Sequence, residues 1–181
     1  MKKCVVIYNP NSGKKSKNSF LKQYKQLLEQ KDYEVITHFT KYHGHATEIV
    51  ENLEYADLVI SVGGDGTFNE VMTGNFKRNE RLLLAHIPLG TTNDIGSMFG
   101  YTKNPVANLK LIMDGVVKGI DICTINGNPF IYVAGFGKFM NVPYETSRDL
   151  KKKYGEDFEY INGVHPSQSD YSEFINNFVR K

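Results

Sequence analysis

The sequence is poor in cysteine, carries little net charge and lacks any long apolar run. Its two cysteines, Cys4 and Cys123, lie in apolar, strand-like stretches without the spacing of metal ligands, so we expect buried thiols rather than a disulfide or zinc site. The apolar start at residues 4–7 is far shorter than the core of a secretory signal. No window approaches the roughly 20 apolar residues that span a bilayer. A cytoplasmic protein is expected, in which any membrane contact is peripheral.

The charge balance does not indicate nucleic acid as a partner. Twenty-two Lys and Arg residues against 20 Asp and Glu residues give a formal net charge of +2, which is too small to indicate nucleic-acid binding. The 181 residues, 40% hydrophobic and 23% charged, have the composition of an ordinary globular protein with one full core. Any basic function must therefore be local.

Short β-branched runs alternate with helical stretches along residues 3–114. Strands are expected at residues 3–8, 34–39, 58–62 and 82–88, and helices at residues 18–30, 45–53, 67–76, 92–99 and 105–114. Because parallel strands need long crossovers, this order predicts an α/β fold, a Rossmann-like parallel sheet with helices on both faces. Ligands of such sheets gather at the carboxyl ends of the strands.

After residue 115 the pattern changes to strands joined by tight turns. Residues 120–125 and 129–134 flank Asn126-Gly127, a pair that favours a type I′ hairpin because both central residues need positive φ. This hairpin is interpreted as the start of an antiparallel β lobe. The expected division is an α/β domain at residues 1–119, a partial second lobe at 120–155 and an atypical tail at 156–181.

The most informative loop is residues 61–71, which follow an apolar strand and lead into a helix. Gly63, Gly64 and Gly66 let the backbone turn sharply and expose N–H groups beside the positive end of that helix, a geometry that suits polyphosphate. Asp65 would face the phosphates, which is favourable only if it holds Mg²⁺ or takes a proton from an acceptor hydroxyl. The alternative is an ordinary glycine-rich turn with Asp65 or Thr67 as helix N-cap.

A second loop with the same placement is residues 87–94. Gly90 permits close approach, and Thr91, Thr92 and Asn93 can donate hydrogen bonds to phosphate oxygens. The alternative here is a helix cap at Thr92 or Asn93. Neither loop is a Walker A motif, because no Gly-Lys-Ser/Thr follows the glycines.

The first two predicted strands also end in loops of interest. Residues 8–14 contain Gly13 and two asparagines, which suit a nest of backbone donors, although the lysines that follow are more often a solvated surface. His43 and His45 stand two residues apart and do not share a helix face, so a zinc site is not expected there.

Taken in order, four motifs resemble the diacylglycerol kinase catalytic domain: Asn9-Pro10-x-Ser12-Gly13, Thr40-x3-Gly44-His45-Ala46, Gly63-Gly64-Asp65-Gly66-Thr67-x-Asn69-Glu70 and Pro88-Leu89-Gly90-Thr91-x-Asn93-Asp94. The resemblance covers residues 3–155. Its glycine motif is shared with NAD kinases and, in variant form, with phosphofructokinases, so an NAD kinase-like enzyme stays an alternative.

The resemblance implies an ATP- and Mg²⁺-dependent kinase that transfers the γ-phosphate to a lipid hydroxyl, such as that of diacylglycerol, at the membrane surface. Asp65 is expected to serve the metal or the transfer itself. The nucleotide contacts that it implies are Asn9, Ser12, Gly13, Thr40, Gly63, Gly64, Asp65, Gly66, Thr67, Asn69, Glu70, Gly90, Thr91 and Asn93.

The end of the chain departs from the family pattern. Gly135-Phe136-Gly137 and residues 141–153 resemble the entry into the second lobe, but the match fails after Gly155, and the late Asp-Gly-Glu motif that supplies a proposed base is absent. A truncated or frameshifted kinase, a shortened nucleotide-binding module without catalysis and an engineered deletion all fit. Unpaired strand edges favour a homodimer, unless a helix at residues 169–179 folds back over them.

Overall fold

The structure, a computed structural model, describes residues 1–12, 17–132 and 134. Its centre is a parallel sheet in the order β2-β1-β3-β4, built from β1 (Lys2–Tyr8), β2 (Tyr33–Phe39), β3 (Leu58–Gly63) and β4 (Leu84–Pro88). The helices are α1 (Lys17–Glu29), α2 (His45–Glu51), α3 (Asp65–Lys77), α4 (Asp94–Met98) and α5 (Pro105–Asp114). The predicted α/β fold is confirmed.

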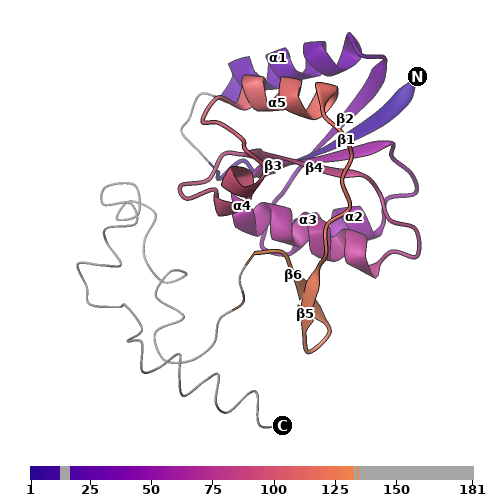
Figure 1. Cartoon of the computed structure of the whole chain (residues 1–181). Helices are drawn as coiled ribbons and strands as arrows, with labels where there is room; N and C mark the ends of the chain where they lie inside the picture. The colour runs from indigo at the N-terminus through magenta and orange to yellow at the C-terminus, as the bar shows by residue number, and fades with distance from the viewer. Residues whose placement is uncertain (13–16, 133, 135–181) are drawn as a thin grey trace, which may run out of the picture. The chain divides into compact units, whose positions relative to one another are not determined.

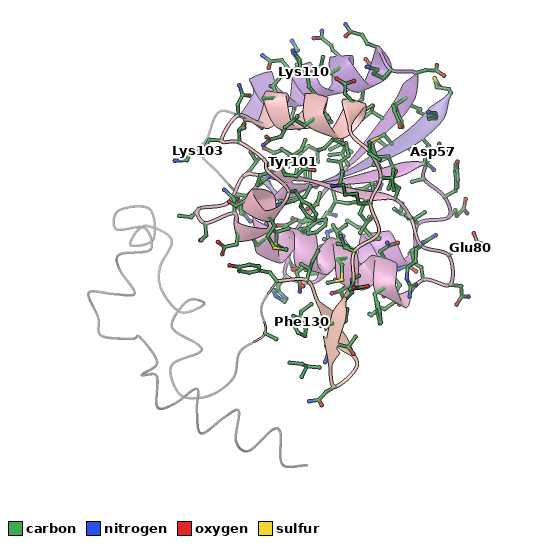
Figure 2. The ribbon with its side chains drawn as sticks, in the orientation of Figure 1. Asp57, Glu80, Tyr101, Lys103, Lys110 and Phe130 are labelled. Atoms are coloured by element: carbon green, nitrogen blue, oxygen red, sulfur yellow. The ribbon has the colours of Figure 1, made fainter. Side chains whose placement is uncertain are left out.

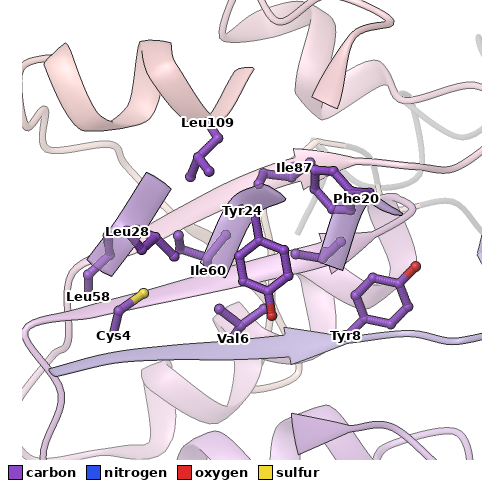
Figure 3. Packing of buried hydrophobic residues seen from close by; sticks show 11 residues of the cluster. Cys4, Val6, Tyr8, Phe20, Tyr24, Leu28, Leu58, Ile60, Ile87 and Leu109 are labelled. Atoms are coloured by element: carbon purple, nitrogen blue, oxygen red, sulfur yellow. The ribbon is translucent and has the colours of Figure 1, made fainter. Parts of the chain in front are cut away.

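Alternate residues of each central strand face opposite helix layers. In β1, Val6 and Tyr8 pack in a cluster with α1 and α5, whereas Val5 and Ile7 pack with α2 and α3. The first cluster surrounds Tyr24 between α1 and the sheet (Figure 3). Because both faces are covered, the central strands are continuous apolar runs rather than alternating ones.

The helix boundaries follow local backbone chemistry. The helix expected at residues 92–99 begins only at Asp94, because Asn93 takes the left-handed conformation with φ 57°. Gly44, at φ 87°, precedes α2 in the same way. Helix α5 begins as expected, with the Asn104 side chain accepting the backbone N–H groups of Val106 and Ala107.

The predicted hairpin is present. Strands β5 (Cys123–Ile125) and β6 (Asn128–Phe130) pair antiparallel, with Asn126 at φ 50° and Gly127 at φ 78° between them. Both central turn residues therefore have the positive φ that the sequence predicts. Figure 1 shows the hairpin apart from the parallel sheet, beside α3.

One prediction about the cysteines is wrong. Cys4 is fully buried, as expected, but Cys123 is exposed, because β5 pairs with β6 alone in the part of the chain that the structure describes. The expected domain boundaries and the homodimer stay predictions. Gly135-Phe136-Gly137 and the helix expected at residues 169–179 lie outside the described residues. Among the helices that are described, none has the length and apolar character needed to cross a membrane.

Candidate functional site

Three of the predicted loops meet at the carboxyl edge of the sheet. The backbone N–H of Asn9 donates to the carbonyl of Val62 at 2.9 Å, and the N–H of Leu89 donates to the carbonyl of Gly63 at 2.6 Å. These bonds continue the sheet pairing beyond β1, β3 and β4 and hold the loops side by side. Figure 1 shows α4 at this edge, next to the start of α3.

The glycine loop, residues 63–67, contacts the threonine loop, residues 89–93, backbone to backbone. A Cβ atom on Gly90 would lie 2.8 Å from the Cα atom of Gly64, closer than real side chains approach. A Cβ atom on Gly63 would lie 2.5 Å from the Thr67 hydroxyl oxygen. Gly66 differs, since a Cβ atom there meets nothing within 4 Å. Packing therefore accounts for Gly63 and Gly90, whereas the space at Gly66 is open.

Thr67 joins the glycine loop to the loop after β1. Its hydroxyl accepts a hydrogen bond from the Asn9 side-chain amide at 2.9 Å. The Asn9 carbonyl oxygen in turn accepts the backbone N–H of Ser12 at 3.1 Å. Sequence reasoning brings Asn9, Ser12 and Thr67 to one site, and the structure places them together. Gly13 lies outside the described residues.

The Asp65 carboxylate points to the start of α4. Its Oδ2 accepts the backbone N–H of Asp94 at 3.0 Å, and its Oδ1 accepts that of Ile95 at 3.2 Å. Burial raises the pKa of Asp65, although these amide donors act in the opposite direction. The alternative in which Asp65 or Thr67 is the N-cap of α3 is wrong, because Gly64 holds that position.

The threonine loop is held by its own asparagine. The Asn93 side-chain oxygen accepts the N–H of Gly90 at 2.7 Å, and its amide donates back to the Gly90 carbonyl at 2.9 Å. Asn93 is the N-cap of α4, as the alternative interpretation predicts, but its side chain makes no cap bond. The exposed Thr91 and Thr92 are thereby fixed at the surface beside the glycine loop.

The loop after β2 joins the site through α3. The Glu70 carboxylate accepts the N–H of Ala46 at 3.2 Å, at the start of α2. The Glu70 carbonyl accepts the Thr47 hydroxyl at 2.9 Å. Thr40 is nearly buried, and its N–H donates to the carbonyl of Tyr8 at 2.9 Å. Glu70 thus stabilises the neighbouring helix, a link that spacing in the sequence does not reveal.

The carboxylates of the site determine how it could hold a metal ion. Among the described residues, no three His, Cys, Asp or Glu side chains gather closely enough to hold one. A carboxylate has about four acceptor positions, and Asp65 uses two of them on backbone amides, so its oxygens retain capacity for a cation. The residues present fit a cation that is shared with phosphate oxygens, not one held by protein ligands alone.

Residues 3–125 match the family of the diacylglycerol kinase catalytic domain. The sequence is 37% identical to a diacylglycerol kinase of Bacillus subtilis (strain 168) over 167 residues, covering 91% of this chain and 55% of that protein. It is 38% identical to a diacylglycerol kinase of Staphylococcus epidermidis (strain RP62A) over 165 residues, covering 90% of this chain and 52% of that protein.

A solved structure gives the same result. A diacylglycerol kinase from Bacillus anthracis (strain Sterne) superposes with a TM-score of 0.66 at 32% sequence identity, covering 71% of this chain and 48% of that chain. The chain therefore spans about half the length of the relatives that it matches.

Proposed function

Because this chain belongs to the diacylglycerol kinase catalytic domain family, we propose that it binds Mg-ATP at the carboxyl edge of its sheet, for phosphoryl transfer to a diacylglycerol-like lipid hydroxyl. The observation that carries this proposal is the backbone contact between Gly64 and Gly90 at the start of α3. It brings two glycine-containing loops together beside a helix N-terminus, where backbone N–H groups and the helix dipole favour phosphate.

Different residues of the loops are proposed to bind different parts of the nucleotide. In the first turn of α3 the N–H of Thr67 donates to the Gly64 carbonyl at 2.9 Å, whereas the N–H groups of Asp65 and Gly66 have no acceptor within the helix and are proposed to bind phosphate oxygens. Thr91, which is exposed beside them, adds a hydroxyl donor. Asn9, Ser12 and Thr40 line the side toward β2 and are proposed to contact the rest of the nucleotide.

Asp65 is the proposed catalytic and metal-binding residue. It accepts two backbone amides at the start of α4, and its remaining acceptor positions are proposed to serve the cation. Bound there, Mg²⁺ supplies charge neutralisation for the transferring phosphoryl group. This arrangement needs no Walker lysine, because phosphoryl transfer depends mainly on alignment and on a favourable electrostatic field.

A nucleotide-binding module without catalysis is the second candidate. The observation that favours it is that the Asp65 carboxylate already accepts the backbone N–H groups of Asp94 and Ile95, a structural role that requires no transfer reaction. The two candidates share the nucleotide site and differ only in turnover.

The test combines binding with transfer. Calorimetric titration of the full chain with Mg-ATP is expected to give saturable binding, which Asp65→Asn weakens at least tenfold. Asp57→Asn is the matched control, because that carboxylate accepts the N–H of Lys3 at the amino edge of the sheet. The same samples are then given labelled ATP with diacylglycerol, ceramide, sphingosine and NAD.

Labelled lipid with the wild type but not with Asp65→Asn supports the kinase. Saturable binding without any labelled product supports the non-catalytic module. No binding of Mg-ATP, or equal binding by Asp65→Asn and the wild type, overturns the proposed site.

A further inference from the structure

A pair of exposed apolar side chains stands directly after the threonine loop. Met98 is 57% exposed and Phe99 is 40% exposed, although they follow the buried Ile95 by only three and four positions. Phe99 also contacts the Tyr101 ring, with centroids 6.0 Å apart. We call residues 98–101 the apolar tip.

The apolar tip is a fixed turn. The N–H of Tyr101 donates to the carbonyl of Gly96 at 2.9 Å, and the N–H of Gly100 donates to that of Ser97 at 3.0 Å. With Gly100 at φ 72°, this pairing is the Schellman arrangement that ends a helix. Gly96 packs so closely on Pro88 that a Cβ atom would lie 2.8 Å from the proline ring. The fold therefore holds Met98 and Phe99 outward.

The charged residue that follows the apolar tip is a lysine. Lys103 stands two positions after Tyr101, whereas the nearest acidic residue in the sequence, Asp94, is only partly exposed and lies at the other end of α4. Lys103 is exposed, and Figure 2 shows its side chain extending away from the ribbon near Tyr101. A rigid apolar projection next to lysine matches the chemistry of an anionic lipid surface, which takes up aromatic and aliphatic side chains and attracts cations.

We propose that the apolar tip inserts into the surface of an anionic lipid bilayer and brings the threonine loop to the depth of lipid hydroxyl groups. This inference rests on the proposed function for its choice of a membrane acceptor. A helical rise of 1.5 Å per residue places Met98 within about 10 Å of Asp94, the first residue of α4, so the tip and the phosphate site can engage one membrane-bound molecule.

The absence of tryptophan from the chain allows a direct test. Phe99→Trp provides a single tryptophan, which can be excited selectively over the 11 tyrosines, at the tip. Leu83→Trp is its matched control, because Leu83 is also 40% exposed but precedes β4 at the opposite edge of the sheet. Both variants are mixed with vesicles of phosphatidylcholine and phosphatidylglycerol in equal parts, with and without brominated acyl chains.

The expected result is a blue shift and bromine quenching for Phe99→Trp, with neither for Leu83→Trp. In sedimentation with the same vesicles, Met98→Ser combined with Phe99→Ser lowers the partition coefficient by roughly tenfold. Lys103→Ala lowers it by roughly fivefold, and pure phosphatidylcholine abolishes that difference. Unchanged thermal unfolding shows that each variant is folded.

A tryptophan at position 99 that stays in water while the chain binds vesicles overturns the inference, as does equal quenching at positions 83 and 99. No vesicle binding overturns it as well. None of these readouts requires ATP, so loss of nucleotide binding contradicts the proposed function alone, and an unquenched tip in an active kinase contradicts the inference alone.

Discussion

The carboxylate of Asp65 accepts the backbone N–H of Asp94 at 3.0 Å, which ties the first turn of α3 to the first turn of α4. The two residues are 29 positions apart in the sequence. Because Gly64 and Gly90 also touch, the glycine loop and the threonine loop form one unit. A change in either loop is therefore expected to alter the other.

The first prediction concerns the acid titration of Asp65. Burial raises its pKa above 3.8, so the folded chain holds this proton more tightly than the unfolded chain does. Its contribution to stability is complete below pH 3.8 and is lost as the pH rises through the raised folded value. Asp65→Asn lacks this titration. Urea unfolding at a series of pH values is expected to show the corresponding decline in the wild type and not in the variant.

The pKa of Asp57 is shifted in the opposite direction. Hydrogen bonds from Tyr55 and from the N–H of Lys3 lower its pKa below 3.8, so its contribution is present above that pH and is lost on acidification. Asp57→Asn should therefore flatten the pH dependence on the acidic side only. The same change of slope in both variants would contradict the assigned cause.

The second prediction separates a packing glycine from a ligand glycine. Gly90→Ala forces a Cβ atom to within 2.8 Å of Gly64 and 2.9 Å of the Asn93 side-chain oxygen, so the loops must move apart. It is expected to lower both the unfolding free energy, by about 1–3 kcal/mol, and the affinity for Mg-ATP. Gly66→Ala meets nothing within 4 Å and should lower the affinity alone. Calorimetry and urea unfolding measure the two effects.

Sequence reasoning predicts that the loops of the candidate site lie together, because each follows an apolar strand and parallel strands end at one edge. It could not find the partner of Asp65. Hydrogen bonds to the amides of Asp94 and Ile95 depend on how two helices approach, which no local pattern encodes. The capping of α2 by Glu70 is hidden for the same reason. The prediction that Cys123 is buried is wrong because an apolar strand is buried only if another layer covers it.

The third prediction concerns Arg78, which follows α3 and stabilises the end of α2. Its guanidinium donates to the carbonyls of Val50 at 3.0 Å and Glu51 at 3.3 Å, and also to that of Leu53. A lysine cannot reproduce this planar fork of donors. Arg78→Lys should lower the free energy of unfolding by about 1–3 kcal/mol. Arg81→Lys, beside the Phe76 ring, is the control and should cost less, since a lysine keeps a cation there. Equal losses would refute the capping role.

The fourth prediction concerns His86, whose ring is 1% exposed on β4 and lies 4.9 Å from the Phe68 ring. Neither ring nitrogen has a hydrogen-bond partner among the described residues. Burial lowers the pKa of His86 from 6.5 to about 4. Between these values the unfolded chain binds a proton that the folded chain does not, so stability is full above pH 6.5 and falls by about 3 kcal/mol toward pH 4.

A phenylalanine removes the titration and keeps the ring against Phe68. His86→Phe is expected to remove the decline in unfolding free energy between pH 6.5 and 4, with a gain at the acidic end, because no imidazole then takes up a proton on unfolding. If the unfolding free energy of His86→Phe still declines between pH 6.5 and 4, other groups cause the acid sensitivity. The His86 ring would then accept its proton while it stays in the core.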